Sequence, residues 1–367
     1  LNRRFEGRLS FLQNNFYAYE DYALVGTKGF TFEGPFYLDG EGHVVGWDEE
    51  CEAHAKKLIE RECVRLRRSL DAAVEAGYKK FLLFLHYPPT NILEQQSPFT
   101  DIAEEYGVEL EVLTSPREID IDKQIDLIRQ VTEDKPDVMI LSAADYDRCA
   151  EATEEAIAAG IGVVAIDTDV NAAGRACYVG SNNYQIGLEM GRAMTSYLPD
   201  GGKVAVIQHM LTTTTGIERT RGVLDALGEA GNIEIFGSFC CDNSTEQAQT
   251  ITTELLSADP EIRGFVCTNE VCNVGAANAL VELGMGGRVY VVGCDNSQRQ
   301  IQFLEQNIIQ AIVTQRPFNM GYMAVQQAVR VANGEQTDDF VEVSCVLITR
   351  ENMYTQENQK LLFPVLR

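Results

Sequence analysis

Two short apolar runs in the last third of the chain have the pattern of buried strands. Residues 289–293 (VYVVG) and 311–313 (AIV) are rich in β-branched side chains and too short for helices, so we predict two parallel strands inside a sheet. A polar residue follows each run, Asp295 after the first and Gln315 after the second. Ligands of open α/β sheets bind outside the carboxyl ends of the strands. We therefore expect the functional site at this edge.

The alternation of short apolar runs with longer amphipathic segments continues from residue 79 to residue 314. Predicted strands are 79–85, 108–113, 137–142, 163–166, 203–208, 233–238, 264–268, 289–293 and 310–314. Predicted helices are 97–107, 119–132, 145–159, 216–230, 244–257, 271–284 and 297–306, and residues 176–198 form a strand that runs into a helix. Strict alternation gives parallel sheets with right-handed crossovers. Two such series predict an α/β protein with two doubly wound parallel-sheet lobes.

Residues 1–78 have a different pattern. The stretch up to Trp47 is rich in aromatic residues and glycine, which is typical of short strands with turns. Residues 48–75 are highly charged and place apolar residues such as Leu66, Leu70 and Ala73 at roughly helical spacing. We predict an α+β segment that precedes the two lobes.

The composition is typical of an ordinary soluble protein with an acidic surface. The 367 residues are enough for two or three domains, and 55 acidic against 30 basic residues give a formal charge of −25. This charge repels nucleic acid and anionic membranes, so we expect neither as a partner. The sequence shows no run of about 18 apolar residues and no basic, apolar leader, so it predicts neither a membrane span nor a signal peptide. Because the chain starts on Leu1, we interpret it as a fragment or a processed form.

The cysteines and histidines form no catalytic or metal-binding motif. The ten cysteines show no CxxC spacing, and several lie inside apolar strand patterns, so we interpret them as small buried hydrophobic residues of a reducing compartment. Cys240 and Cys241 are adjacent and are not expected to pair with each other. Neither a GxSxG motif nor a GxxxxGK[ST] loop is present. We predict no catalytic activity, no cofactor and no metal site.

Seven segments occur in a characteristic order along the rest of the chain. They are EIDIDKQIDLI (118–128), AIAAGIGVVAIDTDVN (156–171), YVGSNNYQIGLEMG (178–191), GIERTRGVLDAL (216–227), CTNEVCNVGAANAL (267–280), VVGCDNS (291–297) and VTQRPFNMGYMAV (313–325). On these segments, the chain from about Ala103 to its end resembles the type I periplasmic sugar-binding proteins. That family includes ribose- and galactose-binding proteins and the sensor domains of lactose-repressor-like regulators.

The resemblance implies two lobes that close around a sugar. Lobe 1 is expected to comprise residues 79–181 and 316–342, and lobe 2 residues 182–315 and 343–367. The implied function is reversible binding of a monosaccharide-like sugar in the interlobe cleft, by a monomer that serves an ABC-type importer and has its membrane subunits as partners. The family works outside the membrane, whereas the missing leader and the free cysteines indicate the inside, so the location stays open.

The resemblance also assigns ligand contacts to five polar residues. They are Asp167, Arg219, Asn269, Asp295 and Gln315. The two carboxylates can each accept hydrogen bonds from neighbouring sugar hydroxyls, and the alternative is that they cap the following helices. The amide of Gln315 can both donate and accept, and the alternative is a hinge hydrogen bond.

Arg219 and Asn269 match the family on the quoted segments. Arg219 corresponds to the arginine of the family's RxxGF motif, and a cation near a helix amino terminus opposes the dipole unless a ligand or a carboxylate compensates it. The alternative is a surface arginine, with Arg221 as the solvent-facing neighbour. Asn269 corresponds to the first residue of the family's Asn-Asp pair, whereas Glu270 is longer than the second.

The aromatic contacts of the family are only partly retained. The position of a sugar-stacking aromatic residue holds Asn243, so that contact is expected to be lost. Asn182 and Asn183 lie at the predicted lobe crossing, where asparagine tolerates unusual backbone angles. Three aromatic residues are candidates to replace the lost contact, with core or surface packing as the alternative: Tyr87, Tyr146 and Phe318.

The first 108 residues carry a second resemblance. LSFLQNNFYAYEDYALVGTKGF (9–30), the charged helix, FLLFLHYPPTN (81–91) and SPFTDIAEEYGVE (97–109) resemble the carboxyl-terminal half of small clostridial-type metallophosphoesterases. In that family His86 would be a metal ligand, but the DxH, GNH[DE] and GHxH motifs are absent. We therefore predict a chimeric chain with an inactive remnant over residues 1–78. We also predict that strand 79–85 replaces the missing first strand of lobe 1 and pairs with strand 108–113.

Other functional classes stay open at this point. A ligand-sensing domain of a transcription regulator would need a helix-turn-helix ahead of the lobes, and residues 1–78 have neither its basic charge nor its helices. A metal-dependent phosphoesterase would need bound metal. A third alternative is a binding module with a degraded pocket.

Overall fold

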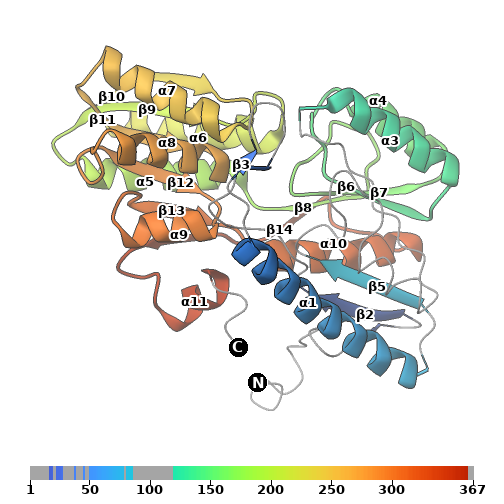
Figure 1. Cartoon of the computed structure of the whole chain (residues 1–367). Helices are drawn as coiled ribbons and strands as arrows, with labels where there is room; N and C mark the ends of the chain where they lie inside the picture. The colour runs from blue at the N-terminus through green and yellow to red at the C-terminus, as the bar shows by residue number, and fades with distance from the viewer. Residues whose placement is uncertain are drawn as a thin grey trace. The chain divides into compact units, whose positions relative to one another are not determined.

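The chain is divided into two compact units, Leu1–Pro116 and Arg117–Arg367. The computed structural model describes residues 16–19, 22–27, 37–38, 44–45, 49–77, 80–85 and 119–362 (Figure 1). The predicted helix 97–107 and strand 108–113 lie outside these residues. Among the helices described, none is long and apolar enough to cross a membrane.

The first unit contains short strands and one long helix, as predicted. β1 (Phe16–Tyr19) pairs antiparallel with β2 (Tyr22–Thr27), and β3 (Tyr37–Leu38) pairs antiparallel with β4 (Val44–Val45). Helix α1 (Glu49–Glu75) buries one face through residues spaced by three or four positions. Those residues are Glu62, Leu66, Ser69, Leu70 and Ala73.

Strand β5 (Lys80–Leu85) belongs to the sheet of the first unit. It pairs in parallel with β2, with Tyr22 opposite Lys80 and Thr27 opposite Leu85. The sheet order is β1-β2-β5. Because residues 108–113 are not described, their pairing with residues 79–85 stays a prediction, and so do the domain boundaries that depend on it.

The second unit contains a four-stranded sheet, which we call the sheet of lobe 1. Its order is β14-β8-β7-β6, and all neighbouring strands are parallel. The strands are β6 (Val138–Leu141), β7 (Gly162–Ile166), β8 (Cys177–Gly180) and β14 (Phe340–Glu342). The helices that pack with it are α3 (Ile121–Asp134), α4 (Ala150–Ala158) and α10 (Pro317–Ala332).

A six-stranded sheet forms the centre of lobe 2. Its order is β10-β9-β11-β12-β13-β15. The strands are β9 (Gly202–Gln208), β10 (Ile233–Cys240), β11 (Ile262–Cys267), β12 (Tyr290–Cys294), β13 (Ala311–Thr314) and β15 (Val346–Thr349). The helices are α5 (Asn183–Tyr197), α6 (Thr214–Glu229), α7 (Thr245–Ala258), α8 (Glu270–Glu282), α9 (Gln298–Glu305) and α11 (Gln356–Leu362).

Both faces of the lobe 2 sheet are buried, which explains the uninterrupted apolar runs of its strands. Successive residues of a strand point to opposite faces. Thus Ile207 and Phe265 belong to the core on one side of the sheet, and Val206 and Val266 belong to the core on the other side. The carboxyl ends of β12 and β13 are therefore anchored between two packed layers. The backbone positions of the polar residues that follow these strands are fixed by this packing.

The predicted α/β class with two doubly wound parallel-sheet lobes is confirmed, with two local differences. Strand β15 runs antiparallel to β13, although strict alternation predicted parallel strands only. Residues 145–149 were predicted as helical, but α4 begins at Ala150. The carboxylate of Asp145 accepts hydrogen bonds from the backbone N–H groups of Asp147 and Arg148, at 3.1 and 2.8 Å. This local turn competes with helix formation.

The chain passes between the two sheets three times. It leaves the lobe 1 sheet after β8 and enters α5, returns between β13 and α10, and crosses again between β14 and β15 (Figure 1). The two sheets are therefore joined by three short connections.

Candidate functional site

Two aspartates occupy equivalent positions in the two lobes. Asp167 directly follows β7 in lobe 1, and Asp295 directly follows β12 in lobe 2. Both adopt left-handed backbone angles, with φ of 63° and 67°. The N–H of Asp167 donates to the carbonyl of Val179 at 3.0 Å, and the N–H of Asp295 donates to that of Val313 at 2.9 Å. Each aspartate thus lies at the carboxyl end of a strand, where its backbone is hydrogen-bonded to the neighbouring strand of the same sheet.

Neither aspartate caps a helix, which removes the alternative interpretation of both residues. The helix after Asp295 is α9, whose cap is Ser297, because the hydroxyl of Ser297 accepts from the N–H of Gln300. Asp167 is followed by an irregular stretch that reaches β8. The two carboxylates are therefore available for other partners.

Arg219 is a buried cation held by three oxygen atoms. It lies on α6, and 2% of the residue is exposed. Its Nε donates to Oδ1 of Asn183 at 2.9 Å, and its Nη1 donates to the carbonyl of Thr268 at 3.0 Å. Nη1 also lies 3.6 Å from Oδ2 of Asp295. The surface alternative is therefore wrong for Arg219, whereas Arg221 is exposed, as expected.

Gln315 contacts the other oxygen of Asp295. Its Nε2 donates to Oδ1 of Asp295 at 2.7 Å. Both oxygens of this carboxylate thus face a donor, and 28% of the Asp295 side chain remains exposed. The hinge hydrogen bond considered for Gln315 exists, and it connects two of the predicted ligand contacts.

Asn269 is positioned as the cap of α8. Its Oδ1 accepts from the N–H of Cys272 at 3.0 Å, and its Nδ2 donates to Oδ1 of Asn243 at 2.8 Å. Asn243 has a left-handed φ of 54°. The residue at the position of the lost aromatic contact therefore orients the Asn269 amide.

A chain of hydrogen bonds connects Arg219 in lobe 2 to Asp167 in lobe 1. Asn183 accepts from Arg219 and donates from Nδ2 to the hydroxyl of Tyr178 at 3.4 Å, and this hydroxyl donates to the carbonyl of Asp167 at 2.7 Å. Burial raises the pKa of the Asp167 carboxyl, the positive charge of Arg219 opposes this rise, and the charge of Asp295 adds to it. The structure thus brings Asp167, Arg219, Asp295 and Gln315 together.

Asn183, Tyr178 and His209 are parts of the site that sequence reasoning did not assign. His209 is 3% exposed, and its ring nitrogens lie 2.8 Å from Oγ1 of Thr268 and 3.1 Å from Oγ1 of Thr215. Burial and, to a smaller extent, the nearby charge of Arg219 lower the pKa of His209 to about 3. His209 is therefore a neutral side chain that contacts Thr268, the residue whose carbonyl accepts from Arg219. Asn182 has an ordinary φ of −72° and caps α5, so the expectation of unusual backbone angles is wrong for it.

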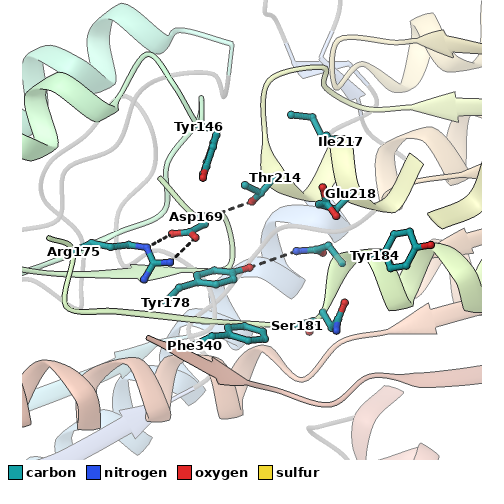
Figure 2. Close-up of a pocket in the computed structure, with 12 residues that line it drawn as sticks. Tyr146, Asp169, Arg175, Tyr178, Ser181, Tyr184, Thr214, Ile217, Glu218 and Phe340 are labelled. Carbon is teal, nitrogen blue, oxygen red and sulfur yellow. Dashed lines mark hydrogen bonds and ion pairs between the residues drawn. The ribbon is translucent and has the colours of Figure 1, made fainter. Parts of the chain in front are cut away.

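A cavity of about 450 Å³ is lined from both lobes by residues that include Tyr178, Asn183 and Thr214 (Figure 2). None of the five predicted ligand contacts is among its lining residues. The lobes touch at its rim, because the N–H of Asp169 donates to Oγ1 of Thr214 at 3.0 Å and the N–H of Tyr146 donates to the carbonyl of Thr212 at 2.9 Å. Tyr146 lines this cavity, whereas the side chains of Tyr87 and Phe318 lie outside the described residues. A sugar-stacking role for these three residues stays a prediction. Within the described part of the chain, no group of three or more His, Cys, Asp or Glu side chains is arranged to hold a metal ion.

Comparison with known proteins agrees with this geometry. Residues 92–336 match the model of the periplasmic binding protein domain. The chain belongs to this family. The two sheets connected by three crossings are thus the two lobes of a periplasmic binding protein.

Similar proteins include a D-allose-binding periplasmic protein from Escherichia coli, which is 24% identical over 80% of this chain and 98% of its own length. A sugar transporter from Clostridium phytofermentans has a solved structure that is 31% identical, with a TM-score of 0.62 over 67% of this chain and 89% of its own. The structure of a glucose-galactose binding protein from Geobacillus stearothermophilus is 26% identical, with a TM-score of 0.64 over 69% and 90% of the two chains.

Proposed function

We propose that this periplasmic binding protein reversibly binds a small, monosaccharide-like sugar in the cleft between its lobes, as the substrate-binding component of an ABC-type importer. The observation that carries the proposal is the convergence of Asp167 from lobe 1 with Arg219, Asp295 and Gln315 from the lobe 2 side. Asn269 completes the proposed set of ligand contacts. Relatives named for D-allose, D-ribose and D-apiose support the ligand class.

The donors and acceptors of this cluster suit a ligand that is rich in hydroxyl groups. Ionised carboxylates only accept hydrogen bonds, guanidinium groups only donate, and carboxamides do both. A sugar hydroxyl can donate to Asp167 or Asp295 and accept from Arg219 at the same time. Hydrogen bonds to charged groups are the stronger ones, so a few of them support micromolar binding, which corresponds to roughly −8 kcal/mol.

Contacts from both lobes are what allow binding to control closure. A ligand shifts the equilibrium between open and closed forms only if it binds one of them better. A sugar held by Asp167 on one side and by Asp295 on the other gains its full set of contacts in the closed form. The closed form is then the signal that the membrane subunits of the importer recognise.

Isothermal titration calorimetry tests the proposal directly. The purified protein is titrated with D-ribose, D-allose, D-apiose, D-glucose, D-galactose and D-arabinose, and at least one is expected to bind with a micromolar or lower Kd. Light scattering before and after titration is expected to give the 40.7 kDa mass of a monomer. Absence of binding to every pentose and hexose would contradict the proposal.

For residues 1–78 we propose an inactive remnant that resembles metallophosphoesterases. A two-metal centre needs several ligands for each ion, and the sequence offers only His86 of the motifs that supply them. Elemental analysis after incubation with Mn²⁺ and Zn²⁺ is expected to show no stoichiometric metal, and hydrolysis of bis-p-nitrophenyl phosphate is expected to stay at the buffer rate. Metal-dependent hydrolysis would contradict this assignment.

A further inference from the structure

Two buried cysteines lie next to each other in lobe 2, although the sequence separates them by 31 positions. Sγ of Cys241 and Sγ of Cys272 are 3.3 Å apart. Cys241 follows strand β10, and Cys272 lies in the first turn of α8. Both residues are completely buried, in the core that covers one face of the sheet. A disulfide has an S–S distance of about 2.05 Å, so the sulfur atoms would have to approach by little more than 1 Å.

The same two segments are joined a second time at the edge of the candidate sugar site. The Asn269 amide donates to Oδ1 of Asn243, two residues after Cys241, and accepts from the N–H of Cys272. The thiol pair and the amide pair are thus parallel connections between residues 241–243 and residues 269–272. A covalent bond at the first connection would hold the second connection in place.

We propose that Cys241 and Cys272 form a disulfide bond under oxidising conditions, and that this bond preorganises Asn269 for the ligand. The second half of the proposal rests on the proposed function, because Asn269 is one of the proposed sugar contacts. Disulfides form in oxidising compartments such as the bacterial periplasm. The interpretation of all cysteines as inert hydrophobic residues then fails for this pair.

The chemistry is an exchange with a small disulfide such as oxidised glutathione, during folding, before the thiols are buried. The Cys241 thiolate attacks one glutathione sulfur, forms a mixed disulfide and expels a glutathione thiolate. Cys272 then attacks the Cys241 sulfur, forms the protein disulfide and expels the second glutathione thiolate. The two protein thiols lose two electrons and two protons, and one oxidised glutathione becomes two reduced glutathione molecules.

In the folded core the two thiols contact each other and apolar neighbours, so the pair is sequestered once it has formed. The neighbouring Cys240 points elsewhere, because its Sγ lies near the carbonyl of His209, at 3.6 Å, and near Oδ1 of Asp242, at 3.3 Å.

Peptide mapping tests the bond itself. The full-length protein is refolded in a glutathione buffer, free thiols are alkylated, and the tryptic digest is analysed by mass spectrometry without reduction. Trypsin leaves Cys240 and Cys241 together in peptide 222–263, and Cys267 and Cys272 together in peptide 264–288. We expect a crosslink between these two peptides that disappears on reduction.

Four variants identify the sulfur atoms that form the crosslink. Cys240→Ala and Cys267→Ala are matched controls from the same two peptides and are expected to retain the crosslink. Cys241→Ala and Cys272→Ala are expected to lose it, while circular dichroism shows that they fold. The oxidised protein is expected to melt about 5–10 °C higher than the reduced protein, and this difference should vanish in both variants. No crosslink in the wild type, or its loss in a control variant, would overturn the proposal.

Calorimetry with the best sugar of the panel tests the functional half. Preorganisation lowers the ordering cost of binding, so the oxidised protein is expected to bind a few-fold more tightly than the reduced protein. An unchanged Kd in the presence of the crosslink would overturn the link to Asn269. A crosslink in a protein that binds no sugar would instead contradict the proposed function and leave the disulfide established.

Discussion

Gln315 donates a 2.7 Å hydrogen bond to Asp295, and this bond joins the carboxyl ends of two neighbouring strands. Gln315 follows β13 at a crossing between the lobes, and Asp295 follows β12. The other oxygen of Asp295 lies 3.6 Å from the guanidinium of Arg219. The carboxylate is thus held in one orientation from two sides while part of it stays exposed. An acceptor fixed in this way loses little conformational freedom when a ligand hydroxyl arrives.

The substitution Asp295→Asn is expected to weaken sugar binding by roughly 10- to 100-fold. It replaces a charged acceptor by a neutral group, and hydrogen bonds to charged groups contribute roughly 1.5–3 kcal/mol. Isothermal titration calorimetry with the best sugar of the panel measures the effect. Asp200→Asn is the matched control, because Asp200 is exposed and precedes β9, at the opposite end of the sheet. Equal affinities of the two variants would remove Asp295 from the site.

The substitution Arg219→Met is expected to lower the free energy of unfolding by about 3–5 kcal/mol. Removal of one partner from a buried ion pair leaves the other charge uncompensated, and here the carbonyl of Thr268 and the amide of Asn183 also lose their donor. Urea denaturation followed by circular dichroism measures the change. Arg221→Met, an exposed position on the same helix, is expected to change stability by no more than about 0.5 kcal/mol. A loss of similar size at both positions would show that burial of Arg219 is unimportant.

The substitution Asp167→Asn is expected to raise the melting temperature at pH 7 while it weakens sugar binding. Burial raises the pKa of the Asp167 carboxyl above the value of 3.8 for an unperturbed aspartate. The folded protein therefore binds this proton more tightly than the unfolded chain does. Stability is greatest below the unfolded pKa and is lost as the pH rises through the folded pKa. The asparagine avoids this loss.

Differential scanning calorimetry without sugar, at pH 7 and at pH 4, measures this effect. The stabilisation by Asp167→Asn should be larger at pH 7 than at pH 4, because lowering the pH protonates the wild-type carboxyl, whose pKa is raised by burial. Asp200→Asn, at an exposed position, is measured alongside as the control. A melting temperature below that of the wild type at pH 7 would mean that the Asp167 charge stabilises the fold.

His209 is expected to make the protein sensitive to acid. Its pKa is lowered from 6.5 to about 3 by burial, so below pH 6.5 the unfolded chain binds a proton that the folded protein excludes. The stabilisation is complete above pH 6.5 and is lost as the pH falls toward 3. At pH 5 the loss amounts to about 2 kcal/mol, from 1.36 kcal/mol for each pH unit.

Urea denaturation at pH 7 and at pH 5 tests this expectation. The decrease in unfolding free energy between the two pH values should be smaller in His209→Asn than in the wild type, even if the variant is less stable at both. The variant with Thr215→Val keeps the imidazole and should keep the pH slope. Identical slopes in the wild type and in His209→Asn would assign the acid sensitivity to other groups.

The regular part of the fold could be predicted because it depends on local patterns. Strands 289–293 and 311–313 are short apolar runs that only a sheet buried on both faces accommodates, and they pair in parallel as predicted. The predicted helix 145–159 was too long at its start, because the Asp145 carboxylate accepts from backbone N–H groups and forms a turn. The spacing of apolar residues carries no information about this turn. Strand β15 pairs antiparallel because the chain reaches it from the other lobe, which is a matter of topology.

The sequence by itself determined the alternation of strands and helices, the polar residues at the strand ends and the acidic surface, because each depends on residues that are close along the chain. Only the tertiary structure decided which of these residues meet. Arg219 contacts Asp295, which lies 76 positions later in the chain. Asn183 and Tyr178 connect Arg219 to Asp167, and Cys241 lies next to Cys272. These contacts arise from the order in which strands lie in a sheet and from the crossings between lobes. No periodicity of the sequence encodes them, because distant residues meet only after the cores on both faces of each sheet have packed.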